Sequence, residues 1–70
     1  MKSVKIKSKK YNTISEVKYY DSKIDMFYCF IPHLDMHLHI HPNAFLLDLG
    51  QEKLDNLKTE MIQNEQKTNW

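Results

Sequence analysis

The stretch from residue 33 to residue 41 alternates strictly between polar and apolar side chains, and this pattern constrains the fold more than any other feature of the chain. Successive side chains of a β-strand point to opposite faces of the sheet. The apolar positions are Leu34, Met36, Leu38 and Ile40, and the polar positions are His33, Asp35, His37, His39 and His41. The alternation predicts a strand that packs its apolar face on a core and leaves its histidines on the opposite face, as in an antiparallel sheet covered on one side only.

Three earlier segments also have the composition of strands. Residues 2–11 alternate loosely between apolar side chains and lysines, which is typical of an edge strand protected from unwanted pairing. Residues 16–20 are rich in strand-forming side chains, and residues 24–31 are apolar on both faces, as expected of a central strand. We therefore expect a sheet of three or four antiparallel strands.

The connections between these segments contain turn-forming residues. Asp21, Ser22 and Lys23 favour a turn after the second segment, and Pro32 ends the third and begins a turn that extends to about residue 35. The residues from Thr13 to Glu16 match a helical capping box, so a short helical turn before the second strand is an alternative.

The last third of the chain has the spacing of an amphipathic helix. Apolar or small side chains recur at steps of three and four residues, at Leu47, Gly50, Leu54, Leu57 and Met61. We expect a continuous helix that begins at Pro42 and packs on one face of the sheet, with a break at Gly50 as the alternative. In a rival interpretation residues 45–49 form another strand. Both interpretations predict a helix over residues 51–65 and a frayed tail over residues 66–70, in one α+β domain that spans residues 1–70.

Length and cysteine content restrict how such a domain is stabilised and where it works. A chain of 70 residues has a small core, and many proteins of this size add a disulfide, a metal or a second subunit. Cys29 is the only cysteine, so no disulfide forms within the chain, which fits a reducing compartment. No apolar stretch is long enough to span a bilayer. We therefore expect a cytoplasmic protein without a membrane partner.

Composition bears on the origin of the chain and on its partners. The sequence contains no arginine and only one alanine and one glycine, and it is rich in residues that A/T-rich codons specify. This composition predicts a low-GC genome, such as that of a bacterium, a phage or a mobile element. The net charge is +1, so nucleic acid is not an expected partner, and we interpret the N-terminal lysines as the solvated face of a strand.

Enzymatic chemistry is not expected from these residues. Cys29 lies in an apolar run, where burial raises a thiol pKa and makes the thiol a poor nucleophile. A single glycine excludes a glycine-rich phosphate loop. The chain is also short for building a substrate cleft. We predict a protein that is not an enzyme and needs no cofactor.

The histidines support one alternative. An H-x-H pair on a strand places two imidazoles on the same side, and imidazole with carboxylate suits Zn²⁺, Ni²⁺ or Cu²⁺. The candidate ligands are His33, Asp35, His37, His39 and His41. One strand supplies ligands from a single direction, so a further ligand would come from a loop or a partner chain. The simpler interpretation is that these side chains are polar residues on the solvated face of a strand.

Aromatic side chains favour a binding function. Val17 and Tyr19 share one face of the second strand, so Tyr20 points to the opposite face, and we expect Tyr20 and Tyr28 to be exposed on the side of the sheet opposite the helix. Aromatic side chains on an uncovered face are typical anchors of protein interfaces. We predict a non-enzymatic intracellular module that docks on a larger host protein, such as a phage or mobile-element regulator or inhibitor. A homodimer is the alternative form of association. The predicted partner-binding residues are Tyr20, Tyr28, His37 and His39.

Overall fold

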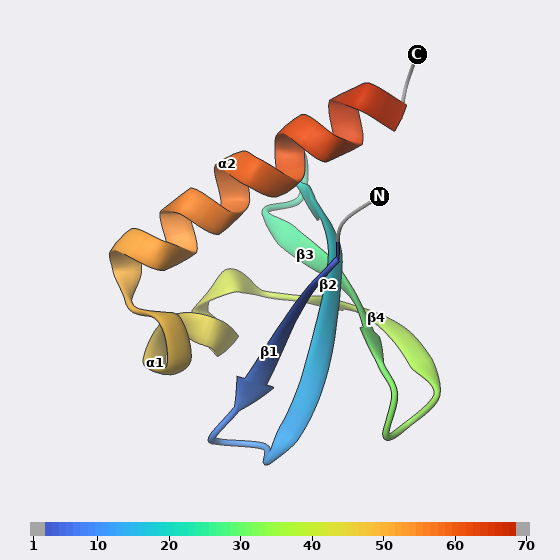
Figure 1. The fold of residues 1–70 in the computed structure, drawn as a ribbon, viewed down its shortest axis with the longest axis vertical. Coiled ribbons are helices and arrows are strands. Elements are labelled where there is room, and N and C mark those ends of the chain that lie inside the picture. The colour runs from blue at the N-terminus through green and yellow to red at the C-terminus, as the bar shows by residue number, and fades with distance from the viewer. Residues whose placement is uncertain (1–2, 69–70) are drawn as a thin grey trace.

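The computed structural model describes residues 3–68, and it describes the side chains of residues 3–62. Four strands form one antiparallel sheet in the order β1-β2-β3-β4, and a 3-10 helix and two α-helices follow. The elements are β1 Val4–Ser8, β2 Thr13–Asp21, β3 Met26–Ile31, β4 Met36–Ile40, η1 Pro42–Phe45, α1 Leu46–Leu49 and α2 Gln51–Thr68. Helix α2 crosses one face of the sheet (Figure 1). The predicted α+β class, the antiparallel sheet and the C-terminal helix are confirmed.

Each hairpin turn contains one residue with a left-handed backbone. These residues are Asn12, Asp25 and Asp35, with φ angles of 50°, 55° and 51°. Asparagine and aspartate tolerate this conformation better than other residues with a side chain. The sequence thus closes all three hairpins with the same type of residue. The alternative of a helical turn from Thr13 to Glu16 is wrong, because both residues belong to β2.

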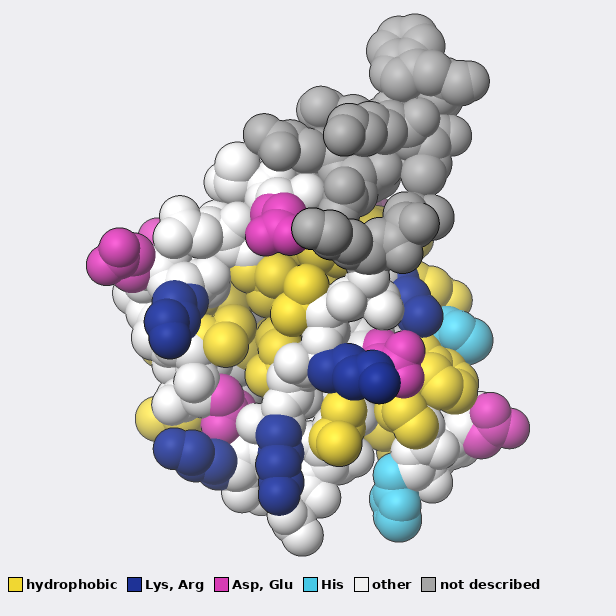
Figure 2. Space-filling view, viewed as in Figure 1, with side chains coloured by type: hydrophobic (Ala, Val, Ile, Leu, Met, Phe, Trp, Pro, Cys, Tyr) yellow, Lys and Arg dark blue, Asp and Glu magenta, His cyan; other side chains and the backbone are white. Residues whose placement is uncertain are grey.

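The core lies between the sheet and the helices. Alternate strand residues face the helices, and they meet Phe45 of η1 and the buried side chains of α2. The buried hydrophobic residues are Ile6, Val17, Tyr20, Phe27, Cys29, Ile31, Phe45, Leu54, Leu57 and Met61. Figure 2 shows hydrophobic side chains at the surface between α2 and the strands, and histidines on the side of β4.

A β-bulge in β2 changes which tyrosine faces the core. Val17 pairs with Cys29 and Tyr19 pairs with Tyr28, so two steps along β2 match one step along β3, and Lys18 is the extra residue. The alternation therefore shifts, and Tyr20 pairs with Phe27 and is buried. The prediction that Tyr20 lies on the uncovered face is wrong, because it assumed a regular strand.

The helical segment breaks at Gly50. Its backbone angles are φ 80° and ψ 163°, a combination that is essentially restricted to glycine. The break separates α1 from α2 and changes the direction of the helix, so Leu47 is 80% exposed while Leu54 is 1% exposed. The predicted continuous helix is therefore wrong, and so is the rival strand over residues 45–49. The backbone N–H of Lys9 donates a 3.0 Å hydrogen bond to Asp48, which ties α1 to the first hairpin.

The end of the chain was predicted to fray over residues 66–70. Helix α2 continues to Thr68, and residues 69 and 70 lie outside the described residues. No helix in the described part of the chain is both long and apolar enough to cross a membrane.

Candidate binding face

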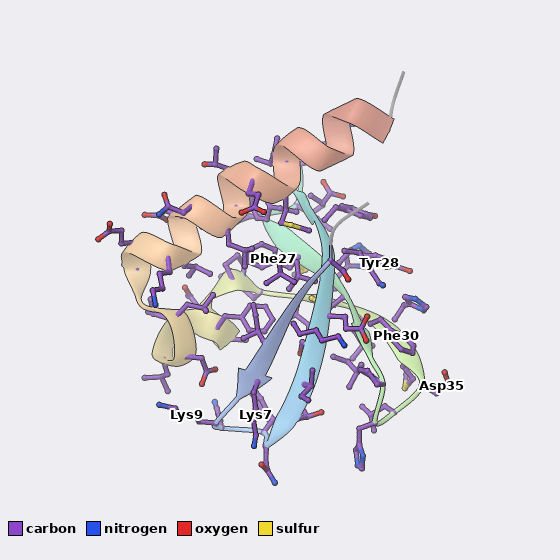
Figure 3. The ribbon with its side chains drawn as sticks, in the orientation of Figure 1. Lys7, Lys9, Phe27, Tyr28, Phe30 and Asp35 are labelled. Atoms are coloured by element: carbon purple, nitrogen blue, oxygen red, sulfur yellow. The ribbon has the colours of Figure 1, made fainter. Side chains whose placement is uncertain are left out.

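The face of the sheet opposite the helices carries a cluster of five rings. Strand pairing places Tyr19, Tyr28 and His39 in one row across β2, β3 and β4. The next row contains Phe30 and His37, which are directly paired. Tyr28 and Phe30 project from the same side of β3, away from Phe27 (Figure 3). We call this group of five side chains the ring cluster.

Tyr28 is the centre of the ring cluster. Its ring stacks on Tyr19 at a centroid distance of 5.1 Å and an interplanar angle of 24°. It also stacks on His37 at 5.6 Å and contacts His39 at 5.1 Å. Phe30 contacts His37 at 4.8 Å. These distances are within the range of favourable aromatic pairs.

The rings are accessible, and charged side chains of β1 and β2 flank them on one side. His37 and His39 are exposed, whereas Tyr19, Tyr28 and Phe30 are partly buried by their neighbours. Glu16 pairs with Phe30 across the strands, and its carboxylate lies 3.4 Å from the ammonium of Lys18. The exposed Lys5 pairs with Glu16 in turn. The face thus combines an aromatic cluster with charged residues beside it, and many protein interfaces have an aromatic core and a polar rim.

The sequence predicted part of this cluster. Tyr28, His37 and His39 lie together as expected, but Tyr20 lies on the opposite face of the sheet. Tyr19 and Phe30 were missed. Phe30 is two residues from Tyr28, so strand alternation alone would have found it. Tyr19 depends on the bulge at Lys18, which no sequence signal indicated.

The structure separates the five predicted metal ligands. His33 and Asp35 lie in the turn before β4, and only His37 and His39 project from the strand itself to one face. His41 follows the strand, and its Nδ1 accepts a 3.2 Å hydrogen bond from the backbone N–H of Asn43, which caps η1. Within residues whose side chains are described, no group of three or more histidine, cysteine or acidic side chains is placed to hold one metal ion.

A cavity opens on the core side of the sheet, at the end that α2 does not cover. Its volume is about 520 Å³, and apolar walls from Ile31, Leu38 and Phe45 surround it. Ser8, Thr13 and Ser15 line the same cavity, and the two serines are buried. Thr13 Oγ1 is buried without a hydrogen-bond partner among the described residues. Packing is therefore incomplete at this end of the core.

Two titratable side chains in the core have strongly shifted pKa values. Burial raises the pKa of the Cys29 thiol to about 12, so the thiol stays protonated at neutral pH. Burial also raises the pKa of Tyr20 to about 12, with further contributions from Asp25, which accepts a hydrogen bond from its hydroxyl, and from the charge of Asp21.

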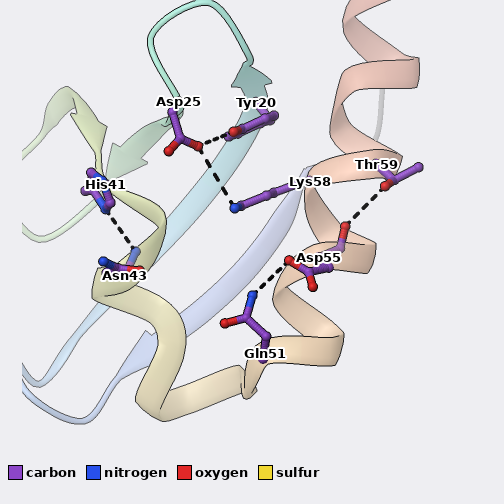
Figure 4. A network of polar contacts seen from close by, with 8 residues as sticks. All are labelled: Tyr20, Asp25, His41, Asn43, Gln51, Asp55, Lys58 and Thr59. Atoms are coloured by element: carbon purple, nitrogen blue, oxygen red, sulfur yellow. Dashed lines mark hydrogen bonds and ion pairs between the residues drawn. The ribbon is translucent and has the colours of Figure 1, made fainter.

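Tyr20 and Asp25 also link the sheet to α2 through Lys58. Asp25 lies 4.0 Å from the ammonium of Lys58, and the same ammonium lies 5.7 Å from the centre of the Tyr20 ring (Figure 4). Both contacts hold α2 against the turn between β2 and β3. Tyr20 therefore has a structural role in this fold.

Comparisons with models of known protein families, with curated proteins and with solved structures each find no significant match.

Proposed function

We propose that this protein is a non-enzymatic binding module that docks on a larger protein through the ring cluster. The observation that carries the proposal is the cluster itself, in which five rings lie in contact on a sheet face that no described helix covers. Aromatic rings in the centre of a polar border are typical anchors of protein interfaces.

The packing of the cluster supports binding because it fixes the side chains in advance. Tyr28 contacts Tyr19, His37 and His39, which restricts the rotation of its ring. Ordering a flexible side chain at an interface costs about 0.5–1.5 kcal/mol, and a side chain that is already restricted loses less freedom on binding. The cluster would therefore bind a flat or shallow apolar surface of a partner at a low cost in side-chain entropy.

The sequence supports the proposed intracellular location and the proposed origin of the protein. An unpaired cysteine fits a reducing cell interior, and the codon-driven composition fits a phage or mobile element in a low-GC host. A small module from such a source would act as a regulator or inhibitor of a larger host protein.

Two matched substitutions test the proposal. Tyr28→Ser and Phe30→Ser each remove a ring from the cluster, and Leu47→Ser removes an exposed apolar side chain from α1 as a control. Each variant is first checked for folding by circular dichroism and then used as bait in extracts of the source cell, with quantitative mass spectrometry. We expect one host protein to be enriched by the wild type and by Leu47→Ser, and to be lost with both ring variants. Equal enrichment by all four baits would contradict the proposal.

A further inference from the structure

The two imidazoles of β4 lie on the same side of one strand and over the same ring. His37 and His39 are both exposed, and their ring centroids lie 5.6 Å and 5.1 Å from that of Tyr28. Two histidines in this relation supply two adjacent nitrogen ligands, but a tetrahedral zinc site needs four. Within residues 3–62 no third histidine, cysteine or acidic side chain is placed to join them, and a second chain can supply the missing ligands.

The strand that carries the histidines forms an edge of the sheet. No other described strand pairs with the outer side of β4, as its place at the end of the strand order shows (Figure 1). Natural proteins protect edge strands with lysines, prolines or bulges. The opposite edge, β1, has Lys5 and Lys7, whereas β4 contains none of these features. Of the two edges, β4 is the one open to a further strand.

Symmetry determines how two copies of β4 can pair. A two-fold axis perpendicular to the sheet keeps each side chain on its own face, and directly opposite residues in a pair share a face. A residue therefore has to lie opposite either itself or a residue an even number of positions away. Centring the pair on Leu38 uses all five residues of the strand, and it places His37 of one protomer opposite His39 of its partner.

We propose that two copies of this chain pair through β4 and bind one divalent metal ion of the zinc, nickel or copper type with His37 and His39 from each copy. Opposite Cβ atoms in such a pair are about 5 Å apart, and same-face neighbours along a strand are about 7 Å apart. Four imidazoles at the corners of this rectangle converge on an ion above its centre, where Zn–N distances of about 2.0–2.1 Å are required. The site is incomplete in one chain and complete in two.

The opposite face of β4 also favours a second copy. Met36 is 49% exposed, and Leu38 and Ile40 are only partly buried at the border of the core. Pairing across Leu38 brings these apolar side chains beside those of the partner and removes them from water. A heterologous pairing of β4 with β1 would instead place Lys5 and Lys7 beside the histidines and would extend into an open fibre.

The experiment uses the untagged full chain with Zn²⁺ as the probe. Light scattering and native mass spectrometry are recorded after chelation and after addition of zinc. We expect a monomer with chelator and a dimer that holds one zinc ion per two chains. The double variant His37→Gln, His39→Gln should stay monomeric with zinc, while His33→Gln, which changes an exposed histidine in the turn, should dimerise like the wild type.

Three results would overturn the proposal. They are a dimer that survives chelation, zinc bound with one ion per chain and no dimer, and equal zinc-dependent dimerisation by the double variant. Circular dichroism shows whether the double variant folds. If it does not, the single variants His37→Gln and His39→Gln are tested for zinc-dependent dimerisation in its place. Both proposals involve His37 and His39, but their failures are distinguishable, because the substitutions at Tyr28 and Phe30 leave all four imidazoles in place.

Discussion

Deletion of Lys18 tests the assignment of the bulge in β2. Removing one residue from the middle of a strand normally moves every following side chain to the wrong face. Here Lys18 is the extra residue, so its deletion leaves Val17 opposite Cys29, Tyr19 opposite Tyr28 and Tyr20 opposite Phe27. The deletion should therefore convert the bulge into a regular ladder without exposing any core side chain.

The expected cost is small and follows from the contacts of Lys18. Its ammonium lies 3.4 Å from Glu16, and the two side chains are 39% and 20% exposed. A pair at the surface contributes about 0–1 kcal/mol, so the free energy of unfolding should fall by no more than about 1 kcal/mol. A domain of 70 residues has a total stability of about 3.5–10 kcal/mol, so the variant should remain folded.

Urea denaturation followed by circular dichroism measures the difference. Deletion of Tyr28 is the matched control, because β3 has no extra residue at that point and the deletion shifts half of a central strand. The control should lose its cooperative transition. If deletion of Lys18 also abolishes folding, Lys18 is not the extra residue, and the register of Tyr19 and Tyr20 is wrong.

Four further predictions concern the stability of the fold. Leu54→Ala should lower the free energy of unfolding by about 2–5 kcal/mol, and Leu47→Ala by less than about 0.5 kcal/mol, in the same urea assay, and equal losses would contradict the break at Gly50. Gly50→Ala should cost about 1–3 kcal/mol through backbone strain alone, since no atom lies within 4 Å of the added methyl group. Thr13→Val should raise the melting temperature, because it removes a buried hydroxyl whose missing hydrogen bond costs about 1–3 kcal/mol, and a lower melting temperature would show that the hydroxyl is satisfied. The raised pKa of Tyr20 means that its protonated form stabilises the folded state. This contribution to the free energy of unfolding is complete below pH 10 and is lost as the pH rises toward 12. Tyr20→Phe should therefore make the fall in stability between pH 10 and pH 12 less steep.

The sequence predicted those parts of the fold that follow from a regular period. The alternation over residues 33–41 correctly placed His37 and His39 on the uncovered face, because β4 is a short strand without a bulge. The lysines of the first segment correctly indicated an edge strand. Both predictions depend only on the two-residue period of a strand.

The errors occur where one residue interrupts a period. Lys18 shifts the alternation of β2 and exchanges the faces of the two tyrosines, and Gly50 ends one helix and begins another with a different orientation. Glycine marks one type of bulge, but β2 contains no glycine, and a glycine in a helical pattern can either continue or end the helix. In both places tertiary packing determines the backbone conformation, and the local sequence alone does not predict it.

The interruption in β2 also explains how one short segment contributes to both faces of the sheet. Tyr20 contacts the buried Phe27 and lies beneath the ammonium of Lys58, which joins the sheet to α2. Tyr19 stacks on Tyr28 in the ring cluster. A chain of this length has one layer of helices and covers one face, so the rings on the other face reduce their contact with water by packing on each other. The same packing supports the proposed docking function, because a side chain that its neighbours already restrict loses less freedom when a partner binds.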